Sequence, residues 1–221
     1  MSIKLTVSVK TLSDWINKYI TLTGESVILT SLKREHIPEL IILASDKRIW
    51  EHYIFDGSDP SKISKQLENA LTAMDNGQQL PFVIFQKEDN KIIGSTRFLD
   101  INSEHKRLEI GWTWLAPEYW SSEINPECKL LLLTFCFEKL NALRVQFKTD
   151  ENNLRSRKAI EKIGGKFEGI LRNDQIRENG TSRNSALYSI LKNEWEEVKP
   201  RLQELFLSAF KKKNLKQNVL Q

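Results

Sequence analysis

The pattern of hydrophobic and polar residues predicts several strands in the first half of the chain. In SVILTSL, residues 26–32, apolar and polar residues alternate, which is typical of a strand with Val27 and Leu29 facing inward. PFVIFQK and KIIGSTRFLDI flank a short polar turn and predict an antiparallel hairpin. Gly94 in the second segment predicts a bulge or a close backbone approach. Another predicted strand, RLEIGWTWLAP, ends at a proline.

Helical spacing of apolar residues predicts several helices along the chain. Leu12, Trp15, Ile16 and Tyr19 indicate a short amphipathic helix docked beside the main domain. A tail from Asn193 onward is also predicted to be helical, with Pro200 breaking or kinking it. The other predicted helices cover residues 34–43, 46–52, 59–76 and 127–140.

After the helix ending near residue 140, strands and a helix alternate. LRVQFKTD is a predicted strand whose buried face carries Leu143, Val145 and Phe147. A helix from Asn153 follows, and then strands near residues 166–172 and 185–191. Antiparallel strands followed by strand, helix and strand predict a mixed α/β fold whose sheet is partly parallel at its centre.

Composition narrows the class of protein. The chain has 221 residues, of which 40% are hydrophobic, and its net charge is only +4 from 33 basic and 29 acidic residues. We therefore expect a globular protein with no nucleic-acid partner. The sequence shows no long uncharged apolar run, which predicts no membrane association and a cytoplasmic location.

Cysteine and histidine positions carry little functional signal. Cys128 and Cys136 lie eight residues apart in one predicted helix, so about 12 Å of helix axis separates them and a disulfide is excluded. We interpret them as reduced core thiols. His36, His52 and His105 have no ligand spacing, which predicts no metal site.

The stretch TDENNLRSRKAIEKIGG combines a helix start with positive charge. Asn153 is a suitable N-cap, and Gly164-Gly165 can end the helix in a left-handed conformation. Arg155, Arg157 and Lys158 fall in the first turns, where the helix macrodipole disfavours cations. A phosphate-bearing ligand would explain them, because helix N-termini bind anions. A solvated charged face is the open alternative.

The spacing N-x-x-S-x-x-A-x-x-x-x-G, formed by Asn153, Ser156, Ala159 and Gly164, resembles the second signature of the GNAT superfamily of acetyl-CoA-dependent N-acetyltransferases. GSTRFLDI and EIGWTWLAPEYW are similar to the branch that contains ribosomal-protein N-terminal acetyltransferases. The resemblance implies an acetyltransferase domain at residues 24–192. The N-terminal helical extension would then be residues 1–23, and the C-terminal helical extension with its basic tail residues 193–221.

The resemblance also implies where acetyl-CoA binds. A sheet splayed between strands 109–115 and 143–148 would hold the cofactor in the gap, with backbone groups pairing with the pantetheine amides. The turn before the next helix would receive the pyrophosphate at its N–H groups. The implied cofactor-binding residues are Trp114, Leu115, Ala116, Ser122, Glu123, Ile124, Asn125, Asn153, Arg155, Ser156 and Lys158.

The sequence departs from the family pattern at two places. Its phosphate turn, WSSEINPE, lacks the usual basic residue and glycine, and Glu123 would repel phosphate if it pointed inward. Asn125 before Pro126 is still a suitable cap for the following helix. Ile160 occupies the position where many family members carry the tyrosine that protonates the leaving thiolate.

Acetyl transfer to an amine needs a base for the amine and a proton donor for the thiolate. Glu109 is the candidate base, although an ion pair with an arginine is the main structural alternative. Ideal alternation would place Glu109, Gly111 and Thr113 on one face of their strand, although a bulge could shift its end. Ser156 is the nearest hydroxyl to act as acid, and a purely structural role at the helix start is equally open.

The acceptor site is predicted among aromatic side chains. Trp50, Tyr53, Arg97 and Trp112 are the candidate substrate-binding residues. Trp112, Trp114, Tyr119 and Trp120 could form an aromatic pocket, but aromatic residues on sheet faces usually pack in the core, and we expect this of at least one tryptophan.

The leading hypothesis is an N-acetyltransferase that acetylates a protein N-terminus or a small amine by direct attack in a ternary complex. A non-catalytic acyl-CoA-binding or partner-binding module is the alternative, and Glu123 and Ile160 motivate it. Nucleic-acid binding through lysines 211–213 and the cluster around Arg155 is a weaker hypothesis, because no recognised binding motif accompanies these basic residues. Relatives often pair, which leaves a homodimer open.

Overall fold

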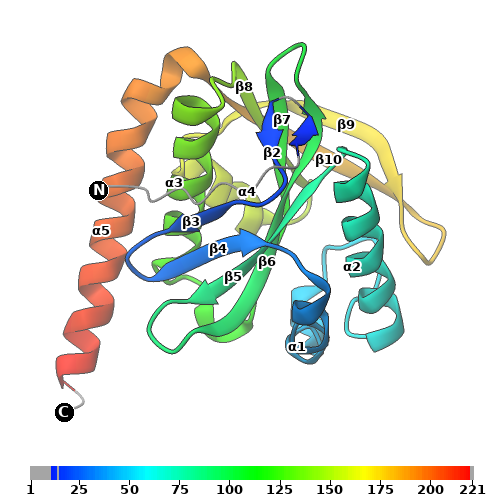
Figure 1. Ribbon diagram of the computed structural model, residues 1–221, viewed down its shortest axis with the longest axis horizontal. Helices are drawn as coiled ribbons and strands as arrows, with labels where there is room; N and C mark the ends of the chain where they lie inside the picture. The colour runs from blue at the N-terminus through cyan, green and yellow to red at the C-terminus, as the bar shows by residue number, and fades with distance from the viewer. Residues whose placement is uncertain (1–10, 14, 220–221) are drawn as a thin grey trace.

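The computed structural model describes residues 11–13 and 15–219 and shows one large mixed sheet flanked by helices (Figure 1). Eight strands follow one another across it in the order β3-β4-β5-β6-β7-β8-β10-β9. The bounds are β3 (Thr21–Thr23), β4 (Val27–Ser31), β5 (Leu80–Gln86), β6 (Lys91–Asn102), β7 (Arg107–Leu115), β8 (Arg144–Asp150), β9 (Lys166–Ile176) and β10 (Ser182–Leu191).

The pairing of β7 with β8 is parallel, and the other pairings in this sheet are antiparallel. Their register covers three residue pairs, from Arg107↔Arg144 to Glu109↔Gln146. Beyond Glu109 the strands are no longer paired, so the sheet opens between the rest of β7 and the rest of β8. The predicted mixed fold with a parallel centre is confirmed.

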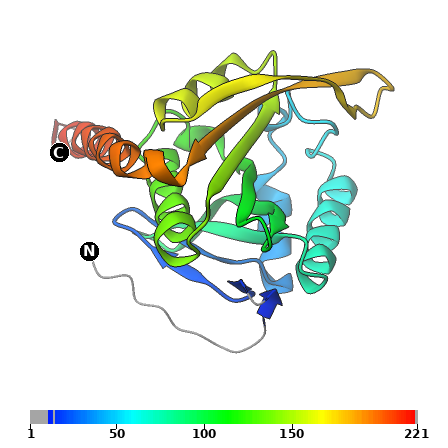
Figure 2. The same ribbon diagram turned by 90° about the horizontal axis from the view of Figure 1, so that it is seen from above.

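Among the described residues five α-helices flank the sheet, and contacts assign four of them to particular strands. α1 (Ile37–Leu43) contacts β6, and α2 (Pro60–Asp75) contacts β5. α3 (Ile124–Thr134) contacts β3 and β4, whereas α4 (Leu154–Lys162) contacts β8. α5 (Trp195–Val219) runs beside α3, at the side of the molecule opposite α2 (Figures 1 and 2). None of the helices in this described part of the chain is long and apolar enough to cross a membrane.

The helix predicted around Leu12 to Tyr19 is wrong for the described residues. β1 (Thr11–Ser13) pairs with β2 (Ile16–Asn17) instead, and β3 follows at once. Ile20 is bonded to Ser31 of β4: its carbonyl accepts from the Ser31 N–H at 3.1 Å, and its N–H donates to Ser31 Oγ at 2.9 Å. These tertiary bonds outweigh the helical spacing of the apolar residues. The part of the prediction at residues 1–10 and 14 lies outside the described residues.

Two other helix predictions need correction. Over residues 46–52 only a 3₁₀ turn (Lys47–Ile49) forms, because Asp46 caps it through the Arg48 N–H at 2.9 Å and the Trp50 indole turns back to the Ala44 carbonyl at 2.7 Å. Of the two effects predicted for Pro200, the break is wrong, because the proline lies inside α5 without ending it, and the kink stays a prediction. Buried Trp195 and Leu202 anchor this helix on both sides of the proline.

The remaining predictions of local structure agree with the fold. Gly94 lies at a register shift between β5 and β6, and a Cβ there would stand 2.2 Å from the Trp114 carbonyl oxygen. Cys128 and Cys136 are buried free thiols, and burial raises the pKa of Cys128 to about 12. Leu143, by contrast, is 52% exposed and precedes β8, so the buried face of that strand begins at Val145.

Candidate active site

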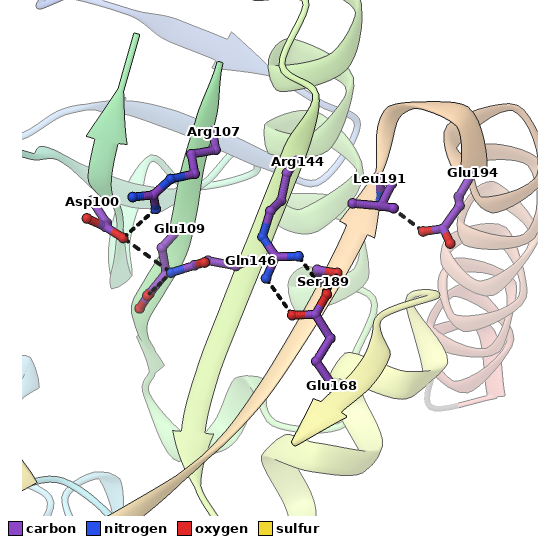
Figure 3. A network of polar contacts seen from close by, with 9 residues as sticks. All are labelled: Asp100, Arg107, Glu109, Arg144, Gln146, Glu168, Ser189, Leu191 and Glu194. Carbon is purple, nitrogen blue, oxygen red and sulfur yellow. Dashed lines mark hydrogen bonds and ion pairs between the residues drawn. The ribbon is translucent and has the colours of Figure 1, made fainter. Parts of the chain in front are cut away.

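Glu109 occupies the last paired position before β7 and β8 separate. Its carboxylate accepts from Gln146 Nε2 at 3.2 Å and lies 3.5 Å from Lys148 Nζ. Gln146 also reaches Asp100, which pairs with Arg107, so Glu109 joins a polar network across β6, β7 and β8 (Figure 3). Burial raises the pKa of Glu109, and Lys148 partly offsets the rise. The cation paired with Glu109 is therefore a lysine, where an arginine was expected.

A bulge in β7 changes which side chains share a face. Arg97 pairs with Gly111 and Ser95 pairs with Trp114, so β7 carries one extra residue between these pairs. Trp112 has a φ of 50°, in the left-handed region. Glu109, Gly111 and Trp114 consequently share one face, and Thr113 turns to the other. The expected grouping of Glu109 with Thr113 is wrong, because ideal alternation ends at the bulge.

A cleft of about 1280 Å³ extends from the opening between β7 and β8 to the starts of α3 and α4. Most of the predicted site residues line it. They are Tyr53, Glu109, Trp112, Trp114, Leu115, Ser122, Glu123, Ile124, Asn125, Asn153, Arg155, Ser156 and Lys158. Trp50, Arg97 and Ala116 are buried and do not line the cleft.

The aromatic residues predicted for the acceptor form a packed wall at one end of this cleft. The Trp50 ring centroid lies 4.9 Å from that of Tyr53 and 5.6 Å from that of Trp114. Tyr53 donates through its hydroxyl to the Thr113 carbonyl at 3.0 Å. Trp50 and Trp114 are buried in the core, as expected of at least one tryptophan, and Trp114, Tyr53 and Trp112 also line the cleft.

Arg97 lies under this aromatic wall. Its guanidinium carbon is 4.7 Å from the Trp112 ring centroid, and burial lowers the pKa of Arg97 to about 10. None of the ion pairs found among residues 11–13 and 15–219 involves Arg97. The stacking on Trp112 therefore accounts for part of the stabilisation of this buried cation.

The turn after β7 differs in detail from the prediction. α3 begins at Ile124, whose N–H donates to Ser122 Oγ at 3.2 Å. Asn125 and Pro126 therefore lie within the first turn, and the predicted Asn125 cap is wrong. The Trp120 indole donates to the Leu115 carbonyl at 2.9 Å, and the Ala116 N–H donates to Ile93 at 3.0 Å. These two backbone groups are already bonded within the protein.

The start of α4 forms the opposite wall. Asn153 Oδ1 accepts from the Ser156 N–H at 2.9 Å, which confirms the predicted N-cap. Arg155 stacks on Trp120, with its guanidinium carbon 3.9 Å from the ring centroid, and so joins this helix to the turn after β7. Arg157 turns away from the cleft and donates to the Tyr188 hydroxyl at 2.9 Å.

Lys129 lines the cleft, although no signal in the sequence selected it. From α3 its ammonium donates to Thr113 Oγ1 at 2.7 Å, and the residue is 6% exposed. Burial lowers the pKa of Lys129 to about 8. Within ECKLLLL it has the pattern of an ordinary surface lysine of a helix, and only the packing of α3 against the sheet buries it.

A sheet that opens between two parallel strands, beside the starts of two helices, defines the class of acyl-CoA-dependent acyltransferases that the sequence resembles. Residues 26–166 match the sequence model of the acetyltransferase (GNAT) domain. The chain belongs to the GNAT family and is an N-acetyltransferase. This family uses acyl-CoA as the acyl donor. CoA carries the acyl group on its thiol as a thioester, and the reaction also needs an acceptor that receives this group.

Three similar proteins illustrate the relationship. YdaF of Bacillus subtilis strain 168, named as a candidate ribosomal N-acetyltransferase, is 28% identical over 82% of this chain and 96% of its own. A structure described as a candidate acetyltransferase from T. thermophilus is 32% identical, with a TM-score of 0.74, over 83% of this chain and 95% of that one. Mycobacterium smegmatis RimJ in complex with CoA-disulfide is 19% identical, with a TM-score of 0.68, over 80% and 88%, and shows the shared fold.

Proposed function

We propose that this enzyme transfers the acetyl group of acetyl-CoA directly to a primary amine, on a protein N-terminus or a small molecule, in a ternary complex. The observation that carries the proposal is the position of Glu109. It is a buried carboxylate at the point where β7 and β8 separate, and it lines the cleft. A base at this point would meet both a thioester lying in the opening and an amine entering beside the aromatic wall.

The cleft walls support acetyl-CoA as the donor. The unpaired part of β7 offers backbone groups to the pantetheine arm, in the manner of an added strand. Asn125 and Ile124 belong to the first turn of α3, whose positive end favours the pyrophosphate. Arg155 and Lys158 on α4 face the same space from the other side. The residues of these walls therefore suit acetyl-CoA. When bound, acetyl-CoA would supply the activated acetyl carbon through its thioester.

In the proposed reaction Glu109 accepts the proton that leaves the amine, directly or through water. The amine nitrogen attacks the carbonyl carbon, a C–N bond forms, and the C–S bond breaks. Backbone N–H groups near Trp114 polarise the carbonyl oxygen. The departing thiolate takes a proton through Ser156, which lines the cleft and regains a proton from water, while the proton held by Glu109 returns to water. Lys129, with its pKa of about 8, is a second proton donor in the cleft wall.

A catalytically impaired acyl-CoA-binding or partner-binding module is the second candidate. Ile160 is buried where relatives carry the acidic tyrosine, and Glu123 places a carboxylate beside the phosphate turn. Both features predict a low rate of acetyl transfer, and both still allow acyl-CoA to bind in the cleft. The two candidates differ in thiol release, which requires turnover and not only binding.

Titration of the wild-type protein with acetyl-CoA, followed by thermal denaturation, tests the proposed donor. A ligand that binds the folded state at about 100 times its Kd adds about 2.7 kcal/mol to the free energy of unfolding. At 2–4 °C for each kcal/mol in a chain of this size, Tm should rise by roughly 5–10 °C. No shift at millimolar acetyl-CoA would exclude it as the donor.

Thiol release with a panel of amines and N-terminal peptides then separates enzyme from module. Glu109→Gln should lower kcat about 100-fold with little change in the Kd for acetyl-CoA, because a positioned base contributes about this much. Glu104→Gln, in the exposed β6–β7 turn, is the matched control and should keep full activity. Equal rates for the two variants would remove Glu109 from the mechanism.

A further inference from the structure

The C-terminal helix α5 forms part of the cleft, although it lies beyond the residues that match the family. It packs along α3 (Figure 1), and residues between 205 and 215 of α5 line the cleft together with the start of α3. The lining residues recur at helical spacing, which puts them on one face of α5. They are Leu205, Ser208, Ala209, Lys212, Lys213 and Leu215.

Lys213 makes the decisive contact on this face. Its ammonium lies 3.1 Å from an oxygen of Glu123, the residue directly before α3, and 4.0 Å from Glu88 in the β5–β6 turn. Glu123 is only 2% exposed, so without Lys213 a buried carboxylate would remain unpaired at the positive end of α3. The acid that departs from the family pattern is thus neutralised by a residue from outside the family domain.

Other charged residues in this part of the cleft are mostly cationic. Lys158 and Lys162 on α4 and Lys212 on α5 are exposed and line it, and Arg155 stacks on Trp120 nearby. Glu118 and Glu123 are the acids facing them. Few backbone donors are left in the turn, because the Ile124 N–H bonds to Ser122 and Pro126 has no N–H.

We propose that the end of α5 is a phosphate-binding subsite for the nucleotide of acyl-CoA. In it Lys212 contacts the phosphates together with Lys158, and Lys213 makes the site usable by neutralising Glu123. The inference rests on the proposed donor. In this subsite, side chains of α5, about 85 residues further along the chain, take the place of the basic residue and glycine that WSSEINPE lacks.

Equilibrium binding of CoA, dephospho-CoA and pantetheine tests this subsite, because the three ligands share the thiol arm and differ in phosphates. Lys212→Ala and Lys213→Ala should each weaken CoA binding about fivefold, as expected for a partly exposed charge contact. Pantetheine affinity should not change. Lys211→Ala is the matched control, since this neighbouring lysine is exposed and does not line the cleft, and it should bind CoA as the wild type does.

A double-mutant cycle isolates the contact between Lys213 and Glu123. Lys213→Ala should cost little CoA affinity in a Glu123→Gln background, and Glu123→Gln alone should bind CoA at least as tightly as the wild type. Equal CoA affinity for the wild type and both lysine variants would overturn the subsite, as would an equal loss for pantetheine. Tighter CoA binding by Lys213→Ala would also overturn it and show that the ion pair closes the cleft. Absence of CoA binding by the wild type would overturn the proposed donor as well.

Discussion

At the scale of single residues, Glu109 belongs both to a structural network and to the cleft. Its carboxylate bonds to Gln146 and pairs with Lys148, while the same residue ends the paired part of β7. Burial raises its pKa although Lys148 and Gln146 oppose the rise, so this carboxylate accepts a proton at a higher pH than an exposed one would. Glu109 can therefore have both a structural and a catalytic role, and kinetic measurements distinguish the two.

The pH dependence of kcat/KM supplies that test. A base must be deprotonated, so activity should rise with pH through the pKa of Glu109, which lies above the ordinary value of 4.5. We expect the acidic limb of the profile above pH 4.5 in the wild type and its loss in Glu109→Gln. If the variant kept the same limb at a reduced rate, another group would be the base.

Lys129 predicts a stability effect with a defined sign. Its folded-state pKa, about 8, lies below the ordinary value of 10.5, so the unfolded chain binds more protons between these two values. This residue therefore destabilises the fold fully below pH 8, and the effect fades as pH rises to about 10.5. The difference corresponds to about 3 kcal/mol.

Urea denaturation of Lys129→Met and the wild type across pH 7–10.5 measures this effect. The variant should be the more stable at pH 7, and the difference should shrink toward pH 10.5. Taking the difference removes the contributions of Cys128 and Tyr53, whose pKa values burial raises. Lys139→Met, at an exposed position, should give no such pH dependence. A constant difference would show that Lys129 is not buried as a cation.

At the scale of elements, the start of α4 is fixed by one side chain. Asn153 accepts from the Ser156 N–H and thereby orients the first turn, whose residues line the cleft. Gly164 ends the helix with a φ of 96°, and a Cβ there would stand 2.8 Å from Val198 of α5. Both ends of this helix are therefore set by local backbone chemistry.

Asn153→Ala should lower the free energy of unfolding by about 1 kcal/mol, the usual cost of a lost N-cap. Asn152→Ala is the matched control, because this exposed neighbour bonds through its backbone alone: its N–H donates to Asp150 and its carbonyl accepts from the Leu154 N–H. Urea denaturation of the two variants measures the difference. Equal stabilities would show that water replaces the cap without cost. CoA affinity should fall in Asn153→Ala, since the capped turn lines the cleft proposed for acetyl-CoA.

At the scale of the whole molecule, α5 is an integral part of the fold and not a loose appendage. Trp195, Leu202 and Phe206 are buried, and the helix packs along α3 beside the sheet (Figure 2). Glu138 accepts from the Trp195 indole at 2.9 Å and pairs with Lys199 at 2.6 Å. This packing is what holds Lys213 against Glu123.

Leu202→Ala should therefore destabilise the whole molecule by about 3 kcal/mol, as expected for a leucine that is 0% exposed. Leu207→Ala makes the same change on the same helix at a side chain that is 48% exposed, and should cost less than about 0.5 kcal/mol. Both are measured by equilibrium denaturation. A small effect of Leu202→Ala would mean that α5 detaches without unfolding the domain.

The sequence by itself determined the strands that alternate clearly, the capped helix at Asn153 and the signature around it, because these depend on neighbours within a few residues. It also selected Glu109 as a candidate. The tertiary structure alone decided that residues 11–13 and 15–23 contribute strands in place of a helix, and that the β7 bulge turns Thr113 away from Glu109. It likewise decided that Lys129 is buried and that Lys213 meets Glu123. Each of these depends on contacts between segments far apart in the chain, and such contacts leave no periodic signal in the sequence.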